Sequence, residues 1–393
     1  MTSSTTSSLN INNNQQIAVQ NATSSSQDPD LVISPAHEKD IQHDEDEGKK
    51  YAQDVLKEYK VDTDPAINAR VQKIAVQLVE IANSHHLIAL WGDKRFSKFP
   101  FKFTVLQGDD VNAFSLPGGY VYIFDGLLKY VESDDELAGV LGHEMSHIEF
   151  RHVATLERDQ SKLSIFTFPL ILFGLLTSGG SGLTAVSLGQ LLDQSTGSGW
   201  SQNAELAADY GGFQILTFSK YNPVAMLTLM EHYARDERVS PNINLGIYRT
   251  HPPSQARARA LEGYLEADHL PLDRSAVSTS FSISVKPEDG GVVAVYFNKD
   301  KIFGFAGADA VTRAEAASKT LNKFLDSQPE VFQVQIGPDG NPTAEGNTLF
   351  DITPDDLIAS KLKSSDLSAQ TVNAIKGAIY AYSTRVWMSE TSS

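Results

Sequence analysis

The sequence Leu-Gly-His-Glu-Met-Ser-His occupies residues 141–147, inside a stretch whose apolar spacing predicts a helix. Histidines four positions apart lie one above the other on a helix face, so the imidazoles of His143 and His147 can reach a single cation. Zinc suits such a pair because it accepts neutral imidazole nitrogen and carboxylate oxygen in tetrahedral geometry. Glu144 projects beside the two histidines, where it can take a proton from a water at the metal. The simpler alternative is an amphipathic helix that happens to contain two histidines.

The bulk composition limits the class of protein. With 393 residues, the chain is long enough for two or more domains. Its formal net charge of -17 argues against a nucleic-acid partner, because binding to phosphates needs clustered Lys and Arg. The sequence contains no cysteine, which excludes disulfides, thiolate zinc sites and a cysteine nucleophile. Any zinc site in this chain must therefore be built from His, Asp and Glu.

Residues 1–33 consist mainly of Ser, Thr, Asn and Gln, a composition too polar to form a core. We expect this N-terminal segment to be disordered. It shows no charged-then-apolar signal sequence, and the chain has no cysteine for lipid attachment. These features fit either a mature exported protein whose leader has been removed or a cytosolic N-terminus.

The pattern over residues 34–270 predicts one domain made mostly of helices. An amphipathic helix begins at Asp64-Pro65, strands cover 101–106 and 112–124 around a Pro-Gly-Gly turn, and acidic residues 134–136 cap the motif helix. Residues 281–388 alternate strand-like and helical patterns and carry no catalytic constellation. We therefore expect an α+β chain: a mainly helical metallopeptidase domain of the zincin type with a small β-sheet, followed by a small C-terminal α+β accessory domain.

Residues 163–176 form an apolar run without a charge, interrupted by Pro169. A helix that crosses a bilayer needs about 20 apolar residues, so this run is too short to span a membrane unaided. We expect a buried hairpin or a hydrophobic lid over the cleft. The alternative is a surface that contacts a membrane peripherally or binds a partner.

A hydrolytic zinc site needs a third protein ligand in addition to the two histidines. The metzincin extension of the motif fails, because Phe150 and Val153 occupy its glycine and histidine positions. His152 lies about 900° around the helix from His143 and should point away from the metal as a packing or supporting residue. Glu205 on a later helix fits as the ligand, and Asp209, one turn further, could accept the N–H of a ligand histidine.

Four motifs in order carry a resemblance to a known family. They are residues 112–119 (Asn-Ala-Phe-Ser-Leu-Pro-Gly-Gly), 136–147 (ending in His-Glu-Met-Ser-His), 205–209 (Glu-Leu-Ala-Ala-Asp) and 250–253 (Thr-His-Pro-Pro). Over about residues 37–265 the chain resembles the HtpX-like zinc metallopeptidases, a gluzincin family that includes the CAAX prenyl endopeptidases and soluble BepA-type proteases. It departs from the integral-membrane members in lacking apolar spans of about 20 residues, which favours a soluble or peripheral enzyme.

The resemblance implies one zinc ion per chain, with a ligand set of His143, His147 and Glu205. It implies that Glu144 is the general base and that the substrate-holding edge strand contains Asn112, Ala113 and Phe114. His251, in the family's His-Pro motif, would stabilise the oxyanion or transiently occupy the open zinc position. Family resemblance also favours an extracytoplasmic location, periplasmic or membrane-associated.

We therefore expect a zinc-dependent metalloendopeptidase that cleaves extended or misfolded polypeptides, with a role in protein quality control. Zinc and Glu144 would activate a water for attack on the peptide bond. One rival is a zinc-stabilised, chaperone-like protein that binds unfolded chains without cutting them, although a pure binder has no need of Glu144. A second rival is a membrane-surface scaffold organised by residues 163–176.

Overall fold

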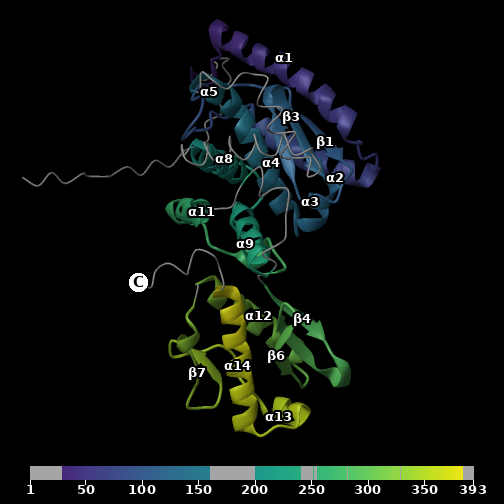
Figure 1. Cartoon of the computed structure of the whole chain (residues 1–393). Coiled ribbons are helices and arrows are strands. Elements are labelled where there is room, and N and C mark those ends of the chain that lie inside the picture. Colours follow the sequence, from purple (N-terminus) through teal and green to yellow (C-terminus); the bar gives the residue numbers. More distant parts are fainter. Residues whose placement is uncertain are drawn as a thin grey trace, which may run out of the picture.

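The computed structural model describes most of the chain as two bodies, one above the other in Figure 1. The described residues are 29–159, 200–239, 251, 255–280, 282–327 and 329–383. The apolar run 163–176 lies outside them, as do residues 1–28 of the polar N-terminal segment. Residues 29–33 are described: they begin with the short helix η1 (Pro29–Leu31), and Ile33 packs against the first core.

A three-stranded sheet forms one side of the upper body. Its strands β1 (Lys102–Leu106), β2 (Ala113–Leu116) and β3 (Tyr120–Phe124) have the spatial order β1-β3-β2, so β2 is an edge strand. β3 pairs parallel with β1 and antiparallel with β2. The turn Pro117–Gly119 joins β2 to β3, as the Pro-Gly-Gly pattern predicts.

The sheet is buried on both faces because its side chains alternate between two apolar clusters. Phe114, Tyr122 and Phe124 pack with Val55 of the long helix α1 (Pro35–Glu58). Side chains on the other face, such as Ile123, join the main core, to which α2 (Pro65–Ala82) contributes Ile74 and Leu78. The edge strand β2 also contacts the motif helix α4.

The motif helix lies at the centre of the main core. α4 (Asp134–Glu149) packs most extensively on α8 (Trp200–Thr217), and both α9 (Val224–Val239) and α11 (Gln255–Ala267) cover these helices. Glycine permits the close approach of α4 and α8: a Cβ on Gly211 would lie 2.4 Å from Oγ of Ser146. The first turns of α8 are thereby held against the two histidines of α4.

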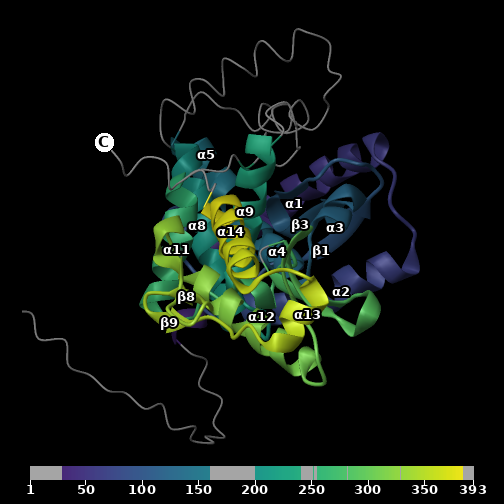
Figure 2. The ribbon, with the colours of Figure 1, turned by 90° about the horizontal axis from the view of Figure 1, so that it is seen from below.

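The lower body has its own apolar core, formed by residues between Ile283 and Ile379. One antiparallel sheet contains β4 (Ile283–Pro287), β5 (Val293–Phe297) and β6 (Asp300–Phe305), and a second small sheet contains β7 (Val334–Ile336), β8 (Pro342–Ala344) and β9 (Asn347–Thr348). The helices are α12 (Ala310–Asp326), α13 (Pro354–Ser360) and α14 (Ser364–Ser383). Figure 2, which looks from below, shows α12, α13 and α14 in front of the upper body.

Polar contacts fasten the segment between the two bodies. The carboxylate of Glu132, just before α4, accepts hydrogen bonds from the Ser278 hydroxyl at 2.7 Å and from the backbone N–H groups of Thr279 and Ser280. The backbone N–H of Arg274 lies 3.4 Å from the Asp326 carboxylate at the end of α12. Among the described residues, no helix combines the length and apolar character needed to cross a membrane.

The structure agrees with the predicted fold class, a mainly helical zincin-type domain followed by α+β structure, and differs from two local predictions. The N-cap of α4 is Ser133, whose hydroxyl accepts a hydrogen bond from the N–H of Glu136 at 3.1 Å, and the acidic residues occupy the first turn instead. The motif helix also ends at Glu149, and the chain turns at Arg151, whose φ is 47°, before α5 (His152–Asp159) begins. His152 therefore lies on a separate helix, and the prediction from one continuous helix was wrong.

Candidate metal centre

Four potential metal ligands meet at one point between α4 and α8. They are His143, His147, Glu205 and His251, and each offers one ligand atom such that all four atoms lie within 4.8 Å of one another. The helical spacing of four residues places Nε2 of His143 3.1 Å from Nε2 of His147. The Glu205 carboxylate, from the first turns of α8, lies 3.4 Å from each of these nitrogens.

His251 completes the cluster from a part of the chain more than 100 residues beyond the motif. Its Nδ1 lies 3.3 Å from Nε2 of His143 and 3.1 Å from the Glu205 carboxylate. Ligands of a tetrahedral zinc ion with bonds of about 2.0–2.1 Å are separated by about 3.3–3.4 Å. The observed separations of 3.1–3.4 Å therefore suit a zinc-sized cation, and the nitrogen and oxygen donors are those that zinc accepts.

Glu144 lies beside this cluster, with 1% of its surface exposed. Its Oε1 lies 3.2 Å from Nε2 of His251, and neither carboxylate oxygen forms a hydrogen bond within the described part of the chain. A buried carboxylate without hydrogen bonds is costly unless a ligand or water completes its environment. Glu144 is thus available to bind and deprotonate a small polar molecule next to the cluster.

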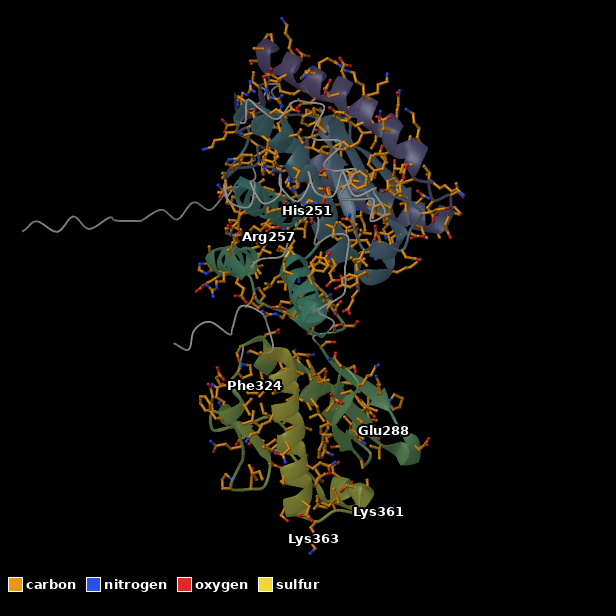
Figure 3. The ribbon with its side chains drawn as sticks, viewed as in Figure 1. His251, Arg257, Glu288, Phe324, Lys361 and Lys363 are labelled. Atoms are coloured by element: carbon orange, nitrogen blue, oxygen red, sulfur yellow. The ribbon has the colours of Figure 1, made fainter. Side chains whose placement is uncertain are left out.

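Arg257 on α11 supports the acidic side of the cluster. Its guanidinium holds Asp209 through two bonds, Nε to Oδ2 at 2.7 Å and Nη2 to Oδ1 at 2.8 Å, and reaches Glu205 at 2.9 Å. Asp209 in turn lies 3.0 Å from Nδ1 of His143, close enough to accept the N–H of that ring. The guanidinium also donates to the backbone carbonyl of His251, and Figure 3 labels both residues in the upper body.

The electrostatics of the cluster follow from this arrangement. Burial alone would raise the pKa of the Glu205 carboxyl, but the charges of His251 and Arg257 outweigh it and hold that pKa well below its ordinary value. Burial would also lower the pKa of His143, but the carboxylates of Asp209 and Glu205 raise it to about 9. The site is a concentrated negative pocket that favours bound positive charge, as a proton or as a metal ion.

Sequence reasoning missed Arg257, and it gave His152 a packing or supporting role but the wrong direction. Arg257 was not selected, although it lies four residues beyond the Thr-His-Pro-Pro motif in the sequence, and a cation so close to a motif of the site could have drawn attention to it. His152, expected to face away from the metal, brings its Nδ1 to within 2.8 Å of Nδ1 of His147. It supports a ligand ring and is not itself part of the ligand cluster.

The side chains of the predicted substrate strand are buried. Asn112, Ala113 and Phe114 are each at most 1% exposed, and Ala113–Leu116 forms the edge strand β2. Because β2 pairs with a strand on one side only within the described part of the chain, its outer backbone edge is the element that an extended peptide could pair with.

A small cavity is lined by Glu144 and other polar residues of the site on one side and by apolar residues on the other. Its volume is about 30 Å³, and its apolar lining comes from α4 and α9, including Val140, Met226 and Tyr233. A space of this size has room for a water-sized molecule beside Glu144. Fold and site together define a metallopeptidase of the His-Glu-x-x-His class.

Comparison with known proteins agrees with this class and gives the family. The chain belongs to peptidase family M48, whose family model matches residues 62–265, just over half of the chain. The family resemblance expected from the four motifs is thereby confirmed.

Individual relatives match parts of the chain. The beta-barrel assembly-enhancing protease of Escherichia coli (strain K12) is 29% identical over 249 residues, which cover 62% of this chain and 48% of that protein. The mitochondrial metalloendopeptidase OMA1 of Schizosaccharomyces pombe is 32% identical over 169 residues, 43% of this chain and 48% of that protein. Metalloprotease LoiP of Escherichia coli is 27% identical over 172 residues, 44% of this chain and 65% of that protein. The chain spans about half the length of the first two of these relatives.

Proposed function

We propose that this protein is a zinc-dependent metalloendopeptidase that hydrolyses peptide bonds within extended or misfolded polypeptides. The observation that carries the proposal is the meeting of two imidazoles and a carboxylate from two helices at tetrahedral spacing, with the buried carboxylate of Glu144, which forms no hydrogen bond within the described residues, beside them. We assign His143, His147 and Glu205 as ligands of one zinc ion per chain. Membership of peptidase family M48 supports this assignment.

The chain's own residues divide the chemistry among them. A zinc ion bound here would act as a Lewis acid toward a water and toward the scissile carbonyl. Glu144 takes a proton from the attacking water on its carboxylate and later delivers it to the leaving amine. Asp209 accepts the Nδ1–H of His143 and so keeps Nε2 of that ring free to act as a ligand.

We assign His251 to the fourth corner of the resting site. Its Nδ1 lies at the same spacing from His143 and Glu205 as the other donors, so a water can enter only when this ring moves aside. In the resting position the Nε2 of this ring lies 3.2 Å from Glu144, and we assign its N–H to stabilise the oxyanion once the ring has moved aside.

The edge strand β2 supports an extended substrate. We infer that a peptide pairs with the outer edge of residues 112–114 through main-chain hydrogen bonds, which would give broad sequence tolerance. Such tolerance suits an enzyme of protein quality control, and the similarity to a protease named for enhancing beta-barrel assembly supports action on other proteins. We also propose an extracytoplasmic location on the family resemblance, and peripheral membrane contact through residues 163–176 stays the alternative to a buried hairpin or a hydrophobic lid.

We further propose that residues 34–270 form the metallopeptidase domain and 281–388 an accessory domain, with 1–33 as a polar N-terminal segment. The two separate apolar cores support this division.

The decisive experiment is a casein cleavage assay with Glu144→Gln. We expect turnover to fall by about 100- to 10,000-fold, because general acid–base catalysis contributes that much, while bound zinc remains at one per chain. A chelator should abolish cleavage by the unaltered enzyme, and added zinc should restore it.

Glu149→Gln is the matched control on the same helix. Burial raises the pKa of the Glu149 carboxyl well above its ordinary value, so this exchange replaces one neutral group by another. We expect it to cleave casein at the parental rate. Zinc binding without any chelator-sensitive cleavage in the parent would favour a chaperone-like binding protein, and absence of bound zinc would refute the proposal altogether.

A further inference from the structure

The two proposed histidine ligands are supported by different partners. Nδ1 of His143 faces the carboxylate of Asp209, which is a common way to orient a metal ligand. Nδ1 of His147 faces another imidazole instead, that of His152, at 2.8 Å. His152 is 2% exposed, and its second nitrogen, Nε2, lies 3.3 Å from the backbone carbonyl of Trp91.

These contacts determine which nitrogen carries each proton. A histidine that binds a metal through Nε2 carries its proton on Nδ1, so His147 must donate from Nδ1. Nδ1 of His152 must then accept, and the proton of a neutral His152 ring must lie on Nε2. That nitrogen faces the carbonyl of Trp91, which can only accept. All three groups therefore agree on one arrangement of protons.

The surrounding backbone is shaped to hold His152 in place. The N–H of Asp93 donates to the carbonyl of Phe150 at 2.7 Å, which fastens the loop containing Trp91 to the turn before α5. Gly92 lies in this loop with φ of +102°, and a Cβ there would approach Cδ2 of His152 to 2.8 Å.

The residue before His152 is also held in place. Arg151 adopts a φ of 47° and binds Asp44 at 2.6 Å and Asp93 at 3.0 Å. A left-handed residue that is not glycine persists only where its surroundings enforce it.

We propose that His152 is a positioning residue that fixes the tautomer and ring orientation of His147 for metal binding. The chain Trp91 carbonyl, His152, His147 is the counterpart of the chain Arg257, Asp209, His143 on the other ligand. Because the partner of His147 is a neutral ring in place of a carboxylate, it orients the ligand without adding negative charge to the site. This inference rests on the proposed function, since it requires zinc to be bound by His147.

Three substitutions of His152 separate positioning from packing. His152→Asn places a carbonyl oxygen near the position of Nδ1 and keeps the acceptor for His147. His152→Gln places an amide nitrogen near the position of Nε2 and keeps only the contact with Trp91. His152→Phe keeps the ring volume and loses both. For the parent and each variant, we would measure the zinc dissociation constant of the full chain by chelator competition. Thermal unfolding of the zinc-free proteins would show how far each substitution disturbs packing.

We expect His152→Asn to bind zinc within about fivefold of the parent, whereas His152→Gln and His152→Phe weaken binding by about 10- to 100-fold. A role in packing alone predicts that Phe is the best replacement, so binding by His152→Phe as tight as that by His152→Asn would overturn the proposal. If the parent itself binds no zinc, the proposed function fails first, and that outcome is distinct.

A second measurement uses the unaltered protein and so does not depend on the folding of variants. In the zinc-loaded chain labelled with ¹⁵N-histidine, two-bond and three-bond ¹H–¹⁵N correlations report the tautomer of each ring. We expect His147 to carry its proton on Nδ1 and His152 on Nε2, with a signal for His152 that disappears in His152→Asn. A proton on Nδ1 of His152 would refute the inference.

Discussion

The metal cluster of the upper body and the Asp356 carboxylate of the lower body are buried in different ways. In the upper body, the four donor atoms of His143, His147, Glu205 and His251 lie within 4.8 Å of one another, with His143 and Glu205 at 3.1–3.4 Å from the other donors, and Glu144 beside them has no hydrogen bond within the described residues. In the lower body, the buried carboxylate of Asp356 accepts hydrogen bonds from the N–H groups of Ala306 and Thr353 and from Arg313.

This difference separates a site from a structural support. Burying a charge costs free energy unless partners satisfy it. The environment of Asp356 is complete as it stands, and the carboxylate joins β6 and α12 to the start of α13. The cluster of the upper body becomes favourable only when a cation lies between its donors. Among the described residues, it is the one cluster of metal-ligating side chains.

The largest effect that this comparison predicts is the loss of the metal from Glu205→Gln. The amide keeps the shape but removes the negative charge and one strong donor. Zinc affinity should fall by more than about 100-fold, since supporting partners of ligands alone cost 10- to 100-fold, and casein cleavage should cease. Chelator competition and the cleavage assay measure the two quantities. Parental zinc affinity in this variant would remove Glu205 from the ligand set.

The site was predictable from sequence wherever helical spacing decides the geometry. Positions i and i+4 on one helix place His143 beside His147 whatever the remaining fold, and the Glu-x-x-x-Asp spacing does the same for Glu205 and Asp209. The fold class followed from periodicity in the same way. What sequence could not give is contact between elements whose relative placement depends on tertiary packing.

His152 and Arg257 illustrate this limit. The distance of His152 from the metal depends on a helix break at Glu149 and a left-handed residue at Arg151, and no glycine or proline marks that break. Arg257 reaches Asp209 only because α11 packs on α8. The N-cap at Ser133 was missed for a local reason. Several acidic residues follow it and could each serve as a cap, but the serine that precedes them is used.

The second prediction concerns Arg257→Met, which removes the cation that holds Glu205 and Asp209. Two buried carboxylates then lie without their cation, so we expect a loss of about 3–5 kcal/mol in the free energy of unfolding of the zinc-free protein. Zinc should recover part of this loss, about 2.7 kcal/mol at a free concentration 100-fold above its dissociation constant. Urea unfolding with and without zinc tests both parts. A stability loss that zinc leaves unchanged would mean that Arg257 acts independently of the metal site.

The lower body supplies the contrasting third prediction, Asp356→Ala. This change leaves two backbone N–H groups and Arg313 without their acceptor, and it should cost about 2–3 kcal/mol, reduced because Arg313 is partly exposed to water. Zinc affinity and casein cleavage should be unchanged at temperatures where the protein is folded. A weakened zinc site would show that the two bodies are coupled and would break the comparison drawn above.

The smallest expected effect is a pH dependence at Glu136, which lies in the first turn of α4, away from the ligands. Burial raises the pKa of its carboxyl to about 7, although the N–H of Glu132 and the hydroxyl of Thr228 donate to it. His232 lies 3.5 Å away on α9. Because the folded state binds this proton more tightly than the unfolded state, the stability due to Glu136 is complete below pH 4.5 and declines up to about pH 7.

Glu136→Gln isolates that contribution, because the amide is neutral at every pH and the other titrating groups are common to both proteins. The variant should gain about 1–2 kcal/mol relative to the parent between pH 4.5 and pH 7.5. Urea unfolding of both proteins across this range gives the difference. A constant difference would mean that Glu136 is ionised throughout, with His232 as its counter-charge. In that case His232 would satisfy the charge of Glu136 as fully as Arg313 and two N–H groups satisfy that of Asp356. The metal centre would then be the place where buried charge awaits a cation.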